Sequence, residues 1–289
     1  MPLPICYLSG NYLPLAEARV SPLDRAFLFG DAVYEVVPVY ASRPFRLREH
    51  LDRLNRSLAG IRMQAPLSHA AWAEVCAALI DRNAGREAYL YLQVTRGAEF
   101  GRNHAWPDDM QPTLFAYVTA LEPASPALLE RGVSAVTATD TRWARRDIKS
   151  TALLANILLK KLSADAGAYE TILLENGELT EGSSTTVHVV MGGVIHTPPN
   201  GQRILPGTTR DVVSELAARL TVRSESAPIT EASLRSADEI WLAMSTRGVL
   251  PVTALDGAMV GAGKPGPLFK RMSDAFADYT RELAGTPAL

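Results

Sequence analysis

Lys149 is the residue of this chain with the clearest capacity for covalent chemistry. It lies in the string Asp147-Ile148-Lys149-Ser150, and Ser150 is a suitable N-cap for a helix over 151–164. The apolar residues of that segment recur at helical spacing: Leu154, Ile157, Leu158 and Leu162. The partial positive charge of a helix N-terminus disfavours a protonated amine, so a lysine placed there forms a Schiff base more readily. The alternative interpretation is an ordinary surface lysine.

Glu181 is a carboxylate in a string of small residues, Thr180-Glu181-Gly182-Ser183-Ser184, between two predicted strands. One interpretation is a hydrogen-bonded turn, which small polar residues favour. The other is a carboxylate beside the nitrogen of a heterocycle. Such a carboxylate would keep the nitrogen protonated, so that the ring could act as an electron sink. The string by itself leaves both interpretations open.

Two pairs of neighbouring hydroxyl residues could bind a phosphate group. Thr208 and Thr209 follow a Pro-Gly pair directly into a helix predicted over 207–220. Hydroxyls and free backbone amides at a helix N-terminus suit a phosphate. Plain capping of the helix by Thr209 is the alternative. Ser245 and Thr246 stand at the end of a predicted strand, which is also a favoured position for a ligand.

Arg53 and His50 lie on a single predicted helix. Arg53 projects off the apolar stripe of that helix, so periodicity alone predicts a solvated arginine. His50 could orient Arg53 or could lie at the surface, and the sequence leaves both open. His188 alternates within a predicted strand, which indicates a structural role. The five histidines show no metal-ligand spacing, so we predict no metal site.

Length and composition limit the classes of protein to consider. At 289 residues the chain has room for two domains of about 150 residues. Apolar residues make up 47% and charged residues 21%, as in a folded globular protein. The 29 basic and 31 acidic residues give a net charge of −2, so electrostatics give no reason to expect nucleic acid or membrane partners.

Three sequence features favour a cytoplasmic protein. Only two cysteines occur, and Cys76 falls in an apolar helical stripe, where a buried thiol is expected. The residues after Met1 lack the basic and apolar regions of a signal peptide. No apolar run reaches the roughly 18 residues that a membrane span needs.

The first part of the chain mixes strands and helices, and its β-branched and aromatic runs alternate with helical stripes. The strands are predicted over 31–40, 89–95 and 113–119, and the helices over 47–61 and 68–85. Two closely spaced prolines, Pro123 and Pro126, then interrupt the pattern. We therefore predict an N-terminal domain over 1–120, a linker over 121–132 and a C-terminal domain over 133–289.

The second part contains short strands in runs. A strand is predicted over 133–139, and an antiparallel meander over 169–175, 185–191 and 194–196, with turns at Asn176-Gly177 and Gly192-Gly193. A further strand is predicted over 239–243 and a final helix over 268–283. Strands in runs, with helices set apart from them, predict the α+β class rather than a doubly wound sheet.

The strings around Lys149, Glu181 and Thr208 occur in this order in the fold-type IV pyridoxal-phosphate transaminases, which the chain resembles from about Tyr12 to its C-terminus. These are the branched-chain aminotransferase-like enzymes. Within that family the resemblance is closest to the D-amino-acid aminotransferases. It rests also on three segments with residues in common: Val33–Tyr40, Glu49–Leu54 and Gln93–Gly97. The resemblance implies a two-domain α+β fold with a smaller N-terminal α/β domain and a larger, β-barrel-like C-terminal domain with flanking helices.

The resemblance also implies pyridoxal 5'-phosphate as cofactor and a role for each residue around it. Lys149 would bind it as a Schiff base and move the proton at the substrate Cα. Glu181 would pair with the pyridinium nitrogen. The phosphate would be held by the remaining cofactor-binding residues: Arg53, Thr208, Thr209, Ser245 and Thr246.

For the substrate, Arg102-Asn103-His104 resembles the carboxylate clamp of the D-amino-acid aminotransferases, with Tyr34 completing it. In that family the arginine and histidine reach in from the neighbouring subunit, so a homodimer is implied. A guanidinium that fixes the α-carboxylate decides which face of Cα presents its hydrogen to Lys149. The implied reaction moves the amino group of a D-amino acid such as D-alanine to 2-oxoglutarate, giving a 2-oxo acid and D-glutamate.

Other functions of the same fold stay open. A branched-chain L-aminotransferase or an (R)-amine transaminase would keep the cofactor and change the substrate, but a bulky apolar pocket would not suit Arg102 and His104. An aminodeoxychorismate lyase would use the same lysine to eliminate pyruvate, and the strand around Tyr34 fits it less well. A relative that binds partners without catalysis is the remaining class.

Overall fold

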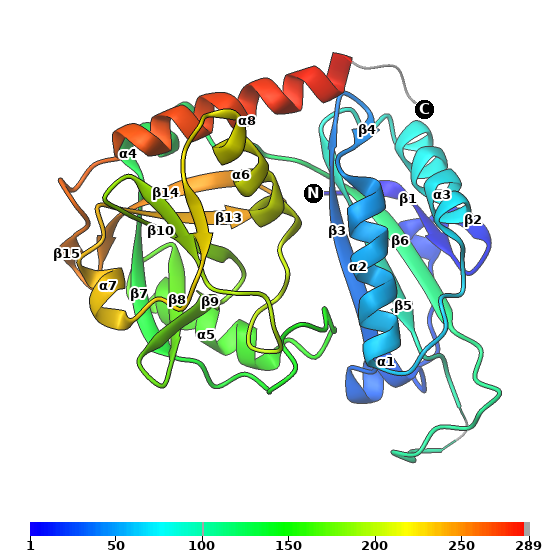
Figure 1. Cartoon of the computed structure of the whole chain (residues 1–289). Helices are drawn as coiled ribbons and strands as arrows, with labels where there is room; N and C mark the ends of the chain where they lie inside the picture. The colour runs from blue at the N-terminus through cyan, green and yellow to red at the C-terminus, as the bar shows by residue number, and fades with distance from the viewer. Residues whose placement is uncertain (100, 286–289) are drawn as a thin grey trace. The chain divides into compact units, whose positions relative to one another are not determined.

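The computed structural model describes residues 1–99 and 101–285, and the chain divides into two compact units. Unit 1 comprises Met1–Glu122, the short segment Ile148–Leu153 and the chain from Leu283 onward. Unit 2 comprises Pro123–Asp147 and Leu154–Glu282 (Figure 1). The predicted domain boundaries stay a prediction.

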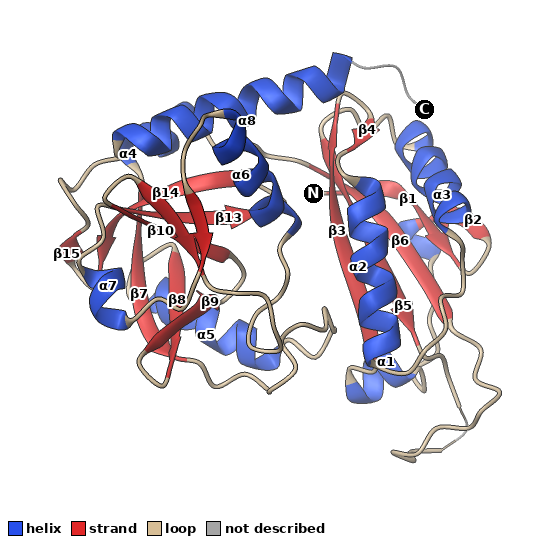
Figure 2. Ribbon diagram, in the orientation of Figure 1, coloured by secondary structure: helices blue, strands red, loops and turns tan. Residues whose placement is uncertain are grey.

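Unit 1 is built on a six-stranded antiparallel sheet with the order β2-β1-β6-β5-β3-β4 (Figure 2). The strands are β1 (Pro2–Leu8), β2 (Asn11–Pro14), β3 (Ala32–Tyr40), β4 (Arg43–Pro44), β5 (Ala88–Thr95) and β6 (Thr113–Ala120). The unit also contains a 3-10 turn (Leu15–Glu17) and helices α1 (Arg25–Phe29), α2 (Leu47–Gly60) and α3 (His69–Arg82). These elements confirm the strands and helices predicted for this part of the chain.

The core of unit 1 lies between this sheet and the helices α2 and α3. Leu51, Leu54 and Leu58 of α2 and Trp72 and Cys76 of α3 are all buried in it, as their helical spacing predicts. Side chains alternate along β3, so its residues 33, 35, 37 and 39 face this core. Glu35 is therefore a carboxylate within an apolar core.

The segment that carries Lys149 extends the edge of this sheet. Tyr34 N–H donates to the Lys149 carbonyl at 3.0 Å, and Thr151 N–H donates to the Ala32 carbonyl at 3.0 Å. The predicted helix start at Thr151, with Ser150 as its cap, is wrong because these backbone groups pair with β3 instead. The helix α5 begins at Leu154.

Unit 2 is built on a nine-stranded mixed sheet with the order β12-β11-β10-β13-β14-β7-β8-β9, and β15 pairs with β14. The strands are β7 (Val133–Thr139), β8 (Glu170–Glu175), β9 (Glu178–Gly182), β10 (Thr186–Met191), β11 (Val194–Thr197), β12 (Ser224–Ser226), β13 (Glu239–Met244), β14 (Gly248–Leu255) and β15 (Ala258–Met259). The helices are α4 (Pro126–Arg131), α5 (Leu154–Asp165), α6 (Thr208–Arg219), α7 (Glu231–Arg235) and α8 (Pro267–Gly285), whose last residues, from Leu283, belong to unit 1.

The sheet of unit 2 curls around its own core (Figure 2). Val187, Val189, Ile240 and Leu242, from the paired strands β10 and β13, are all buried there. The helices α4, α6 and α7 contact strands β14, β13 and β9. The curled mixed sheet and the separate helices confirm the predicted α+β class. Among the described residues, no helix combines the length and apolar character of a membrane span.

The meander predicted over 169–196 is wrong in its first half. The Asn176-Gly177 turn leads into β9, which pairs antiparallel with β8, and not into β10. Glu181 therefore lies on a strand rather than in a turn. The second half of the meander, the hairpin of β10 and β11, is confirmed.

Candidate functional site

Lys149 lies beside the first residues of β3 and is half-buried. Its Nζ is 4.4 Å from the centre of the Tyr34 ring. Its backbone N–H donates to Ser57 Oγ of α2 at 3.1 Å. The amine is therefore positioned by a strand edge and not by a helix N-terminus, so the helix-based reason for its reactivity is wrong. The predicted partners Lys149 and Tyr34 do come together.

Tyr34 begins a row of aromatic rings on the sheet face opposite α2. Its ring stacks on Tyr91 with centroids 5.6 Å apart, and Tyr91 in turn lies 5.2 Å from Tyr117. Tyr91 Oη donates to Gln93 Oε1 at 2.7 Å. Because this row braces Tyr34, the ring next to Lys149 has a fixed plane.

Arg53 is buried, 3% exposed, and faces Glu35 across the core of unit 1. Its Nε donates to Glu35 Oε1 and its Nη2 to Glu35 Oε2, both at 2.7 Å. His50 Nδ1 lies 2.8 Å from Glu35 Oε2. The solvated arginine and the surface histidine that periodicity allowed are both wrong, because the only charged side chain of β3 points into the core and holds them there.

The charges in this cluster shift two pKa values. Burial raises the pKa of Glu35, but the charge and hydrogen bonds of Arg53 and His50 outweigh it, so the net pKa is far below its usual range. Burial lowers the pKa of His50. Its bond to Glu35 opposes this, while the charges of Arg53 and Lys149 add to it. At neutral pH the cluster thus holds an ionised glutamate against Arg53, beside a neutral histidine.

Arg102 and His104 are exposed and lie on the loop after β5. The Arg102 guanidinium is 5.0 Å from the centre of the Phe29 ring, and the His104 ring meets the same ring edge-on at 5.5 Å. Arg25, 3% exposed, donates to the Asn103 carbonyl at 2.7 Å and the His104 carbonyl at 3.1 Å. Among the described residues, neither clamp residue forms a hydrogen bond, ion pair or ring contact with Tyr34 within one chain.

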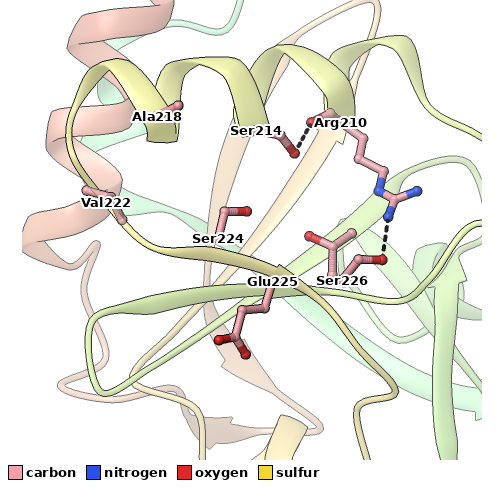
Figure 3. A pocket seen from close by; sticks show the side chains of 8 residues that line it. Arg210, Ser214, Ala218, Val222, Ser224, Glu225 and Ser226 are labelled. Carbon is pink, nitrogen blue, oxygen red and sulfur yellow. Dashed lines mark hydrogen bonds between the residues drawn. The ribbon is translucent and has the colours of Figure 1, made fainter.

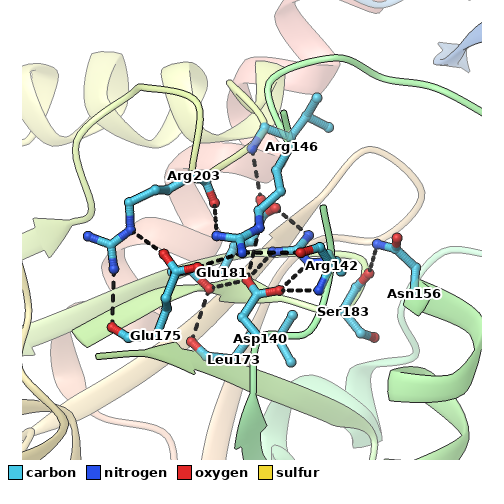
Figure 4. Close-up of polar contacts among 11 residues, drawn as sticks. Asp140, Arg142, Arg146, Asn156, Leu173, Glu175, Glu181, Ser183 and Arg203 are labelled. Atoms are coloured by element: carbon cyan, nitrogen blue, oxygen red, sulfur yellow. Dashed lines mark hydrogen bonds and ion pairs between the residues drawn. The ribbon is translucent and has the colours of Figure 1, made fainter. Parts of the chain in front are cut away.

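Glu181 is buried on β9 of unit 2, with 6% of its surface exposed (Figure 4). Its Oε1 accepts a hydrogen bond from Arg142 Nη1 at 2.5 Å, and its Oε2 accepts one from Leu205 N–H at 3.1 Å. Burial raises the pKa of Glu181, although the charge of Arg142 opposes the rise. A carboxylate can accept about four hydrogen bonds, so acceptor capacity remains for a further donor.

Asp140 and Arg142 are parts of this site that sequence reasoning missed. Asp140 accepts two hydrogen bonds from the Arg142 side chain, from Nε at 2.9 Å and from Nη2 at 2.6 Å, and one from the Arg142 backbone N–H at 3.1 Å. Thr180 Oγ1 also donates to Asp140 at 2.7 Å. The two residues lie in a loop without periodicity. The only sequence signal was a cluster of arginines close to Lys149.

Thr208 and Thr209 are the first two residues of α6, and both are buried. Gly207 is the N-cap, and no side chain of the described chain caps this helix. Plain capping by Thr209 is therefore wrong. A Cβ on Gly207 would lie 2.6 Å from Thr186 Oγ1, so only glycine fits between α6 and β10. Uncapped amides beside two hydroxyls are a suitable site for a phosphate.

Glu181, the start of α6 and the pair Ser245 and Thr246 are linked through backbone contacts at one end of the sheet of unit 2. Leu205, which donates to Glu181, leads directly to Gly207 beside Thr186. Thr186 pairs with Ala243 of β13. The half-buried Ser245 and Thr246 follow at the end of that strand. Unit 2 thus gathers its predicted site residues, and unit 1 gathers Lys149 and Tyr34.

A separate cavity of about 300 Å³ lies alongside α6 (Figure 3). Its lining includes Arg210, Ser214 and Ser226. Arg210 donates to Ser226 Oγ at 3.2 Å and to the Pro198 carbonyl at 2.9 Å. This arginine therefore braces the neighbouring loop, and we assign it no part in the predicted phosphate site.

Histidine plays a structural part in unit 2, as predicted for His188. Its side chain is fully buried, and Nδ1 lies 2.7 Å from Thr197 Oγ1. Burial lowers its pKa to about 3, so the ring is neutral. Within the described ranges 1–99 and 101–285, no group of His, Cys, Asp and Glu could hold a metal ion.

Known proteins resemble the chain over nearly its whole length. Residues 32–255 match the family described as amino-transferase class IV. A D-alanine aminotransferase of Bacillus licheniformis is 39% identical over 267 residues, which cover 92% of this chain and 94% of that protein. The branched-chain amino acid aminotransferase of Escherichia coli has a similar structure, with a TM-score of 0.89, 27% identity, and coverage of 96% of this chain and 94% of the other. A second branched-chain amino acid aminotransferase, solved with pyridoxamine 5'-phosphate, gives the same TM-score and coverage at 25% identity.

Proposed function

The chain belongs to the class IV aminotransferase family, and from that premise we propose that it transfers the amino group of D-amino acids such as D-alanine to 2-oxoglutarate. The products are the 2-oxo acid and D-glutamate. The observation that carries the proposal is the buried Glu181 tied through Leu205 to the uncapped start of α6. This arrangement presents an anion and a phosphate site on one stretch of chain.

Pyridoxal 5'-phosphate is the cofactor of this family, and the residues of this chain fit it. Glu181 offers a buried anion for the ring nitrogen, and Thr208 and Thr209 offer hydroxyls and free amides for the phosphate. Ser245 and Thr246 would add hydroxyls, and Arg53 a positive charge held by Glu35. Lys149 would hold the cofactor through its amine. When bound, the cofactor supplies a ring that withdraws electrons from the substrate Cα.

Lys149 would also move the proton at the substrate Cα. Its half-buried amine beside Tyr34 is the candidate base, since the described residues place no carboxylate within salt-bridge distance of it. The rigid Tyr34 ring limits the directions open to that amine. A general base fixed in this way acts on one face of Cα only, which is the basis of stereoselectivity.

Selectivity for D-amino acids would come from the carboxylate clamp of Arg102, His104 and Tyr34. Arg25 holds the backbone of the clamp loop, while the side chains of Arg102 and His104 stay exposed. A branched-chain L-aminotransferase is the second candidate, favoured by solved structures at 25% and 27% identity. The 39% identical D-alanine aminotransferase supports the first candidate more strongly.

A homodimer would bring that clamp into the neighbouring active site. The support is the apolar face of α5, where Leu154, Ile157, Leu158 and Leu162 are between 49% and 70% exposed. The opposite face, with Leu159 and Ser163, is buried in unit 2. A helix with apolar residues on both faces favours a partner surface on the exposed one.

Cytoplasmic localisation completes the proposal. Cys6 and Cys76 are both free thiols, and both are buried. Burial raises the pKa of Cys76 to about 12, so it stays a protonated and unreactive thiol. Two thiols without a disulfide are consistent with a reducing compartment.

A panel of paired D- and L-amino acids with 2-oxoglutarate tests the proposed reaction. We expect D-alanine and other small D-amino acids to support turnover, with D-glutamate as a chiral product. Their L-enantiomers should be at least about a hundredfold slower, because a fixed clamp and base reach one face of Cα. Turnover with L-leucine or L-valine but not with D-alanine would contradict the proposal and favour the branched-chain alternative.

A further inference from the structure

Arg142 lies between two buried carboxylates of unit 2 (Figure 4). Its side chain is 6% exposed, that of Asp140 is 0% exposed and that of Glu181 is 7% exposed. Nε and Nη2 of Arg142 are used by Asp140, and Nη1 points to Glu181. Asp140 binds two nitrogens of the guanidinium and so fixes its plane. The third nitrogen, Nη1, lies in the same plane and is thereby directed at Glu181.

The charges around Glu181 explain what this arrangement achieves. Burial favours the neutral acid, and the nearby charge of Asp140 favours it further. Arg142 and the Leu205 N–H favour the carboxylate. Arg146 lies beyond Asp140, with its Nε at 3.5 Å from the aspartate. Arg142 is the only cation within 4.0 Å of Glu181 in the described part of the chain, so its loss would leave Glu181 with the charge of Asp140 and without an ion-pair partner.

We propose that Arg142, oriented by Asp140, is the positioning residue that keeps Glu181 ionised and aimed, and that it thereby sets the protonation of the cofactor's ring nitrogen. The inference rests on the proposed function, because it needs a pyridine nitrogen at Glu181. A neutral Glu181 would offer the nitrogen one acceptor oxygen and no charge. The ring would then lose its proton and most of its capacity to withdraw electrons.

The same cluster offers a matched control. Arg203 belongs to its exposed end, donating to Glu175 at 2.7 Å and to Glu178 at 2.8 Å. Its side chain is 46% exposed and does not contact Glu181 among the described contacts. Arg203→Leu removes the same charge from the same cluster as Arg142→Leu. Any difference between the two variants therefore reports on contact with Glu181 and not on net charge.

The test uses holoenzyme prepared with pyridoxal 5'-phosphate isotopically labelled at the ring nitrogen, observed by solid-state nitrogen NMR near neutral pH. We expect a protonated nitrogen in the wild type and in Arg203→Leu. In Arg142→Leu the ratio of protonated to free nitrogen should fall by about tenfold or more, as a shift of one pKa unit requires. Arg142→Lys keeps the charge but loses the bidentate geometry, and it should restore part of the signal.

A second variant guards against a failure of Arg142→Leu to fold. Arg142→Gln keeps a polar side chain at this position but loses the charge, so it should move the nitrogen signal in the same direction as Arg142→Leu. A ring nitrogen that stays protonated in both Arg142→Leu and Arg142→Gln would overturn the inference.

The proposed function fails in a different way. Glu181→Gln should abolish the ring proton whichever residue orients Glu181. If Glu181→Gln loses the proton and the Arg142 variants keep it, the function stands and the role of Arg142 is refuted. A wild-type protein that takes up no pyridoxal 5'-phosphate contradicts both.

Discussion

The guanidinium of Arg53 and the carboxylate of Glu35 are joined by two hydrogen bonds of 2.7 Å in the core of unit 1. Glu35 is the only charged residue of β3, and it is fully buried. Two parallel hydrogen bonds to one carboxylate fix the direction of the guanidinium. Arg53, which we propose as a phosphate ligand, is therefore oriented by Glu35 of β3, the strand that also carries Tyr34.

Glu35→Gln should destabilise the fold. It leaves the buried charge of Arg53 without its counter-ion, which costs about 3–5 kcal/mol in known cases. Urea denaturation of the wild type and the variant measures the difference. The control is Glu231→Gln, which removes the exposed pair of Glu231 and Arg235 and should cost at most about 1 kcal/mol. Equal losses of unfolding free energy in the two variants would show that the buried pair of Glu35 and Arg53 contributes no more than an exposed pair.

Acid should destabilise the wild type more steeply than Glu35→Gln. The folded-state pKa of Glu35 lies below its unfolded value of about 4.3, so its contribution is fully present above that pH. Protonation of the unfolded chain removes it progressively as the pH falls towards the folded-state pKa. The free energy of unfolding, measured between neutral pH and about pH 3, should therefore converge for the two proteins. A constant difference in unfolding free energy between the two proteins across this pH range would contradict the charge-based account.

Lys149→Ala should abolish turnover and leave the fold intact. The segment is held by backbone hydrogen bonds of Lys149, which the substitution keeps. We expect at least about a thousandfold loss of kcat, because a base and a cofactor anchor are both removed. Stability should change by no more than about 0.5 kcal/mol. Lys161→Ala, at an exposed lysine of α5, is the control. Near-normal activity of Lys149→Ala would refute the mechanism.

Arg102→Leu should weaken the binding of substrate carboxylates. A charge-assisted hydrogen bond is worth about 1.5–3 kcal/mol, so the KM for D-alanine should rise about tenfold or more. Uptake of pyridoxal 5'-phosphate should not change, because Arg102 lies outside the residues assigned to the cofactor. Arg86→Leu, also exposed on unit 1, is the comparison. Full activity on D-alanine in Arg102→Leu would overturn the assignment of the clamp.

Charge on the exposed face of α5 should dissociate the proposed dimer. Ile157 is 62% and Leu158 60% exposed in the single chain, and each should bury its side chain against the second copy. Loss of one such contact costs about 1.5–3 kcal/mol, so Leu158→Glu should raise the dimer dissociation constant at least about tenfold. Sedimentation measures it. Lys270→Glu, at an exposed position of α8, makes the same change of charge away from this face and should have little effect. A monomeric wild type would contradict the proposal.

Local patterns predict much of this fold, because periodicity reports which face of an element is buried. The apolar stripe of α2 is confirmed, and so is the strand predicted over 31–40, which is β3. Where tertiary pairing competes with local preference, the sequence misleads. Ser150 is a good helix cap by type, yet the residues around it pair with β3 and the helix starts at Leu154. Four apolar residues of α5 recur as a helix requires but lie on its exposed face: Leu154, Ile157, Leu158 and Leu162.

The sequence suggests candidate site residues where one short string carries the chemistry, as with Glu181 and the pair Thr208 and Thr209. It does not suggest the residues that contact them from other segments. Glu35 meets Arg53 only because β3 and α2 pack together, and Arg142 meets Glu181 only through the packing of a loop on β9. Such partners are set by three-dimensional contacts between distant segments, to which periodicity is blind.

The chain passes between the two units four times, at Glu122–Pro123, Asp147–Ile148, Leu153–Leu154 and Glu282–Leu283. The short segment Ile148–Leu153 brings Lys149, the lysine we propose to bind the cofactor, to the edge of a sheet whose strands all precede it in the sequence. A chimera that took residues 1–122 from one relative and the rest from another would combine Ile148–Leu153 of one parent with the sheet of the other. Such chimeras should keep their function only when these six residues come from the same parent as β3.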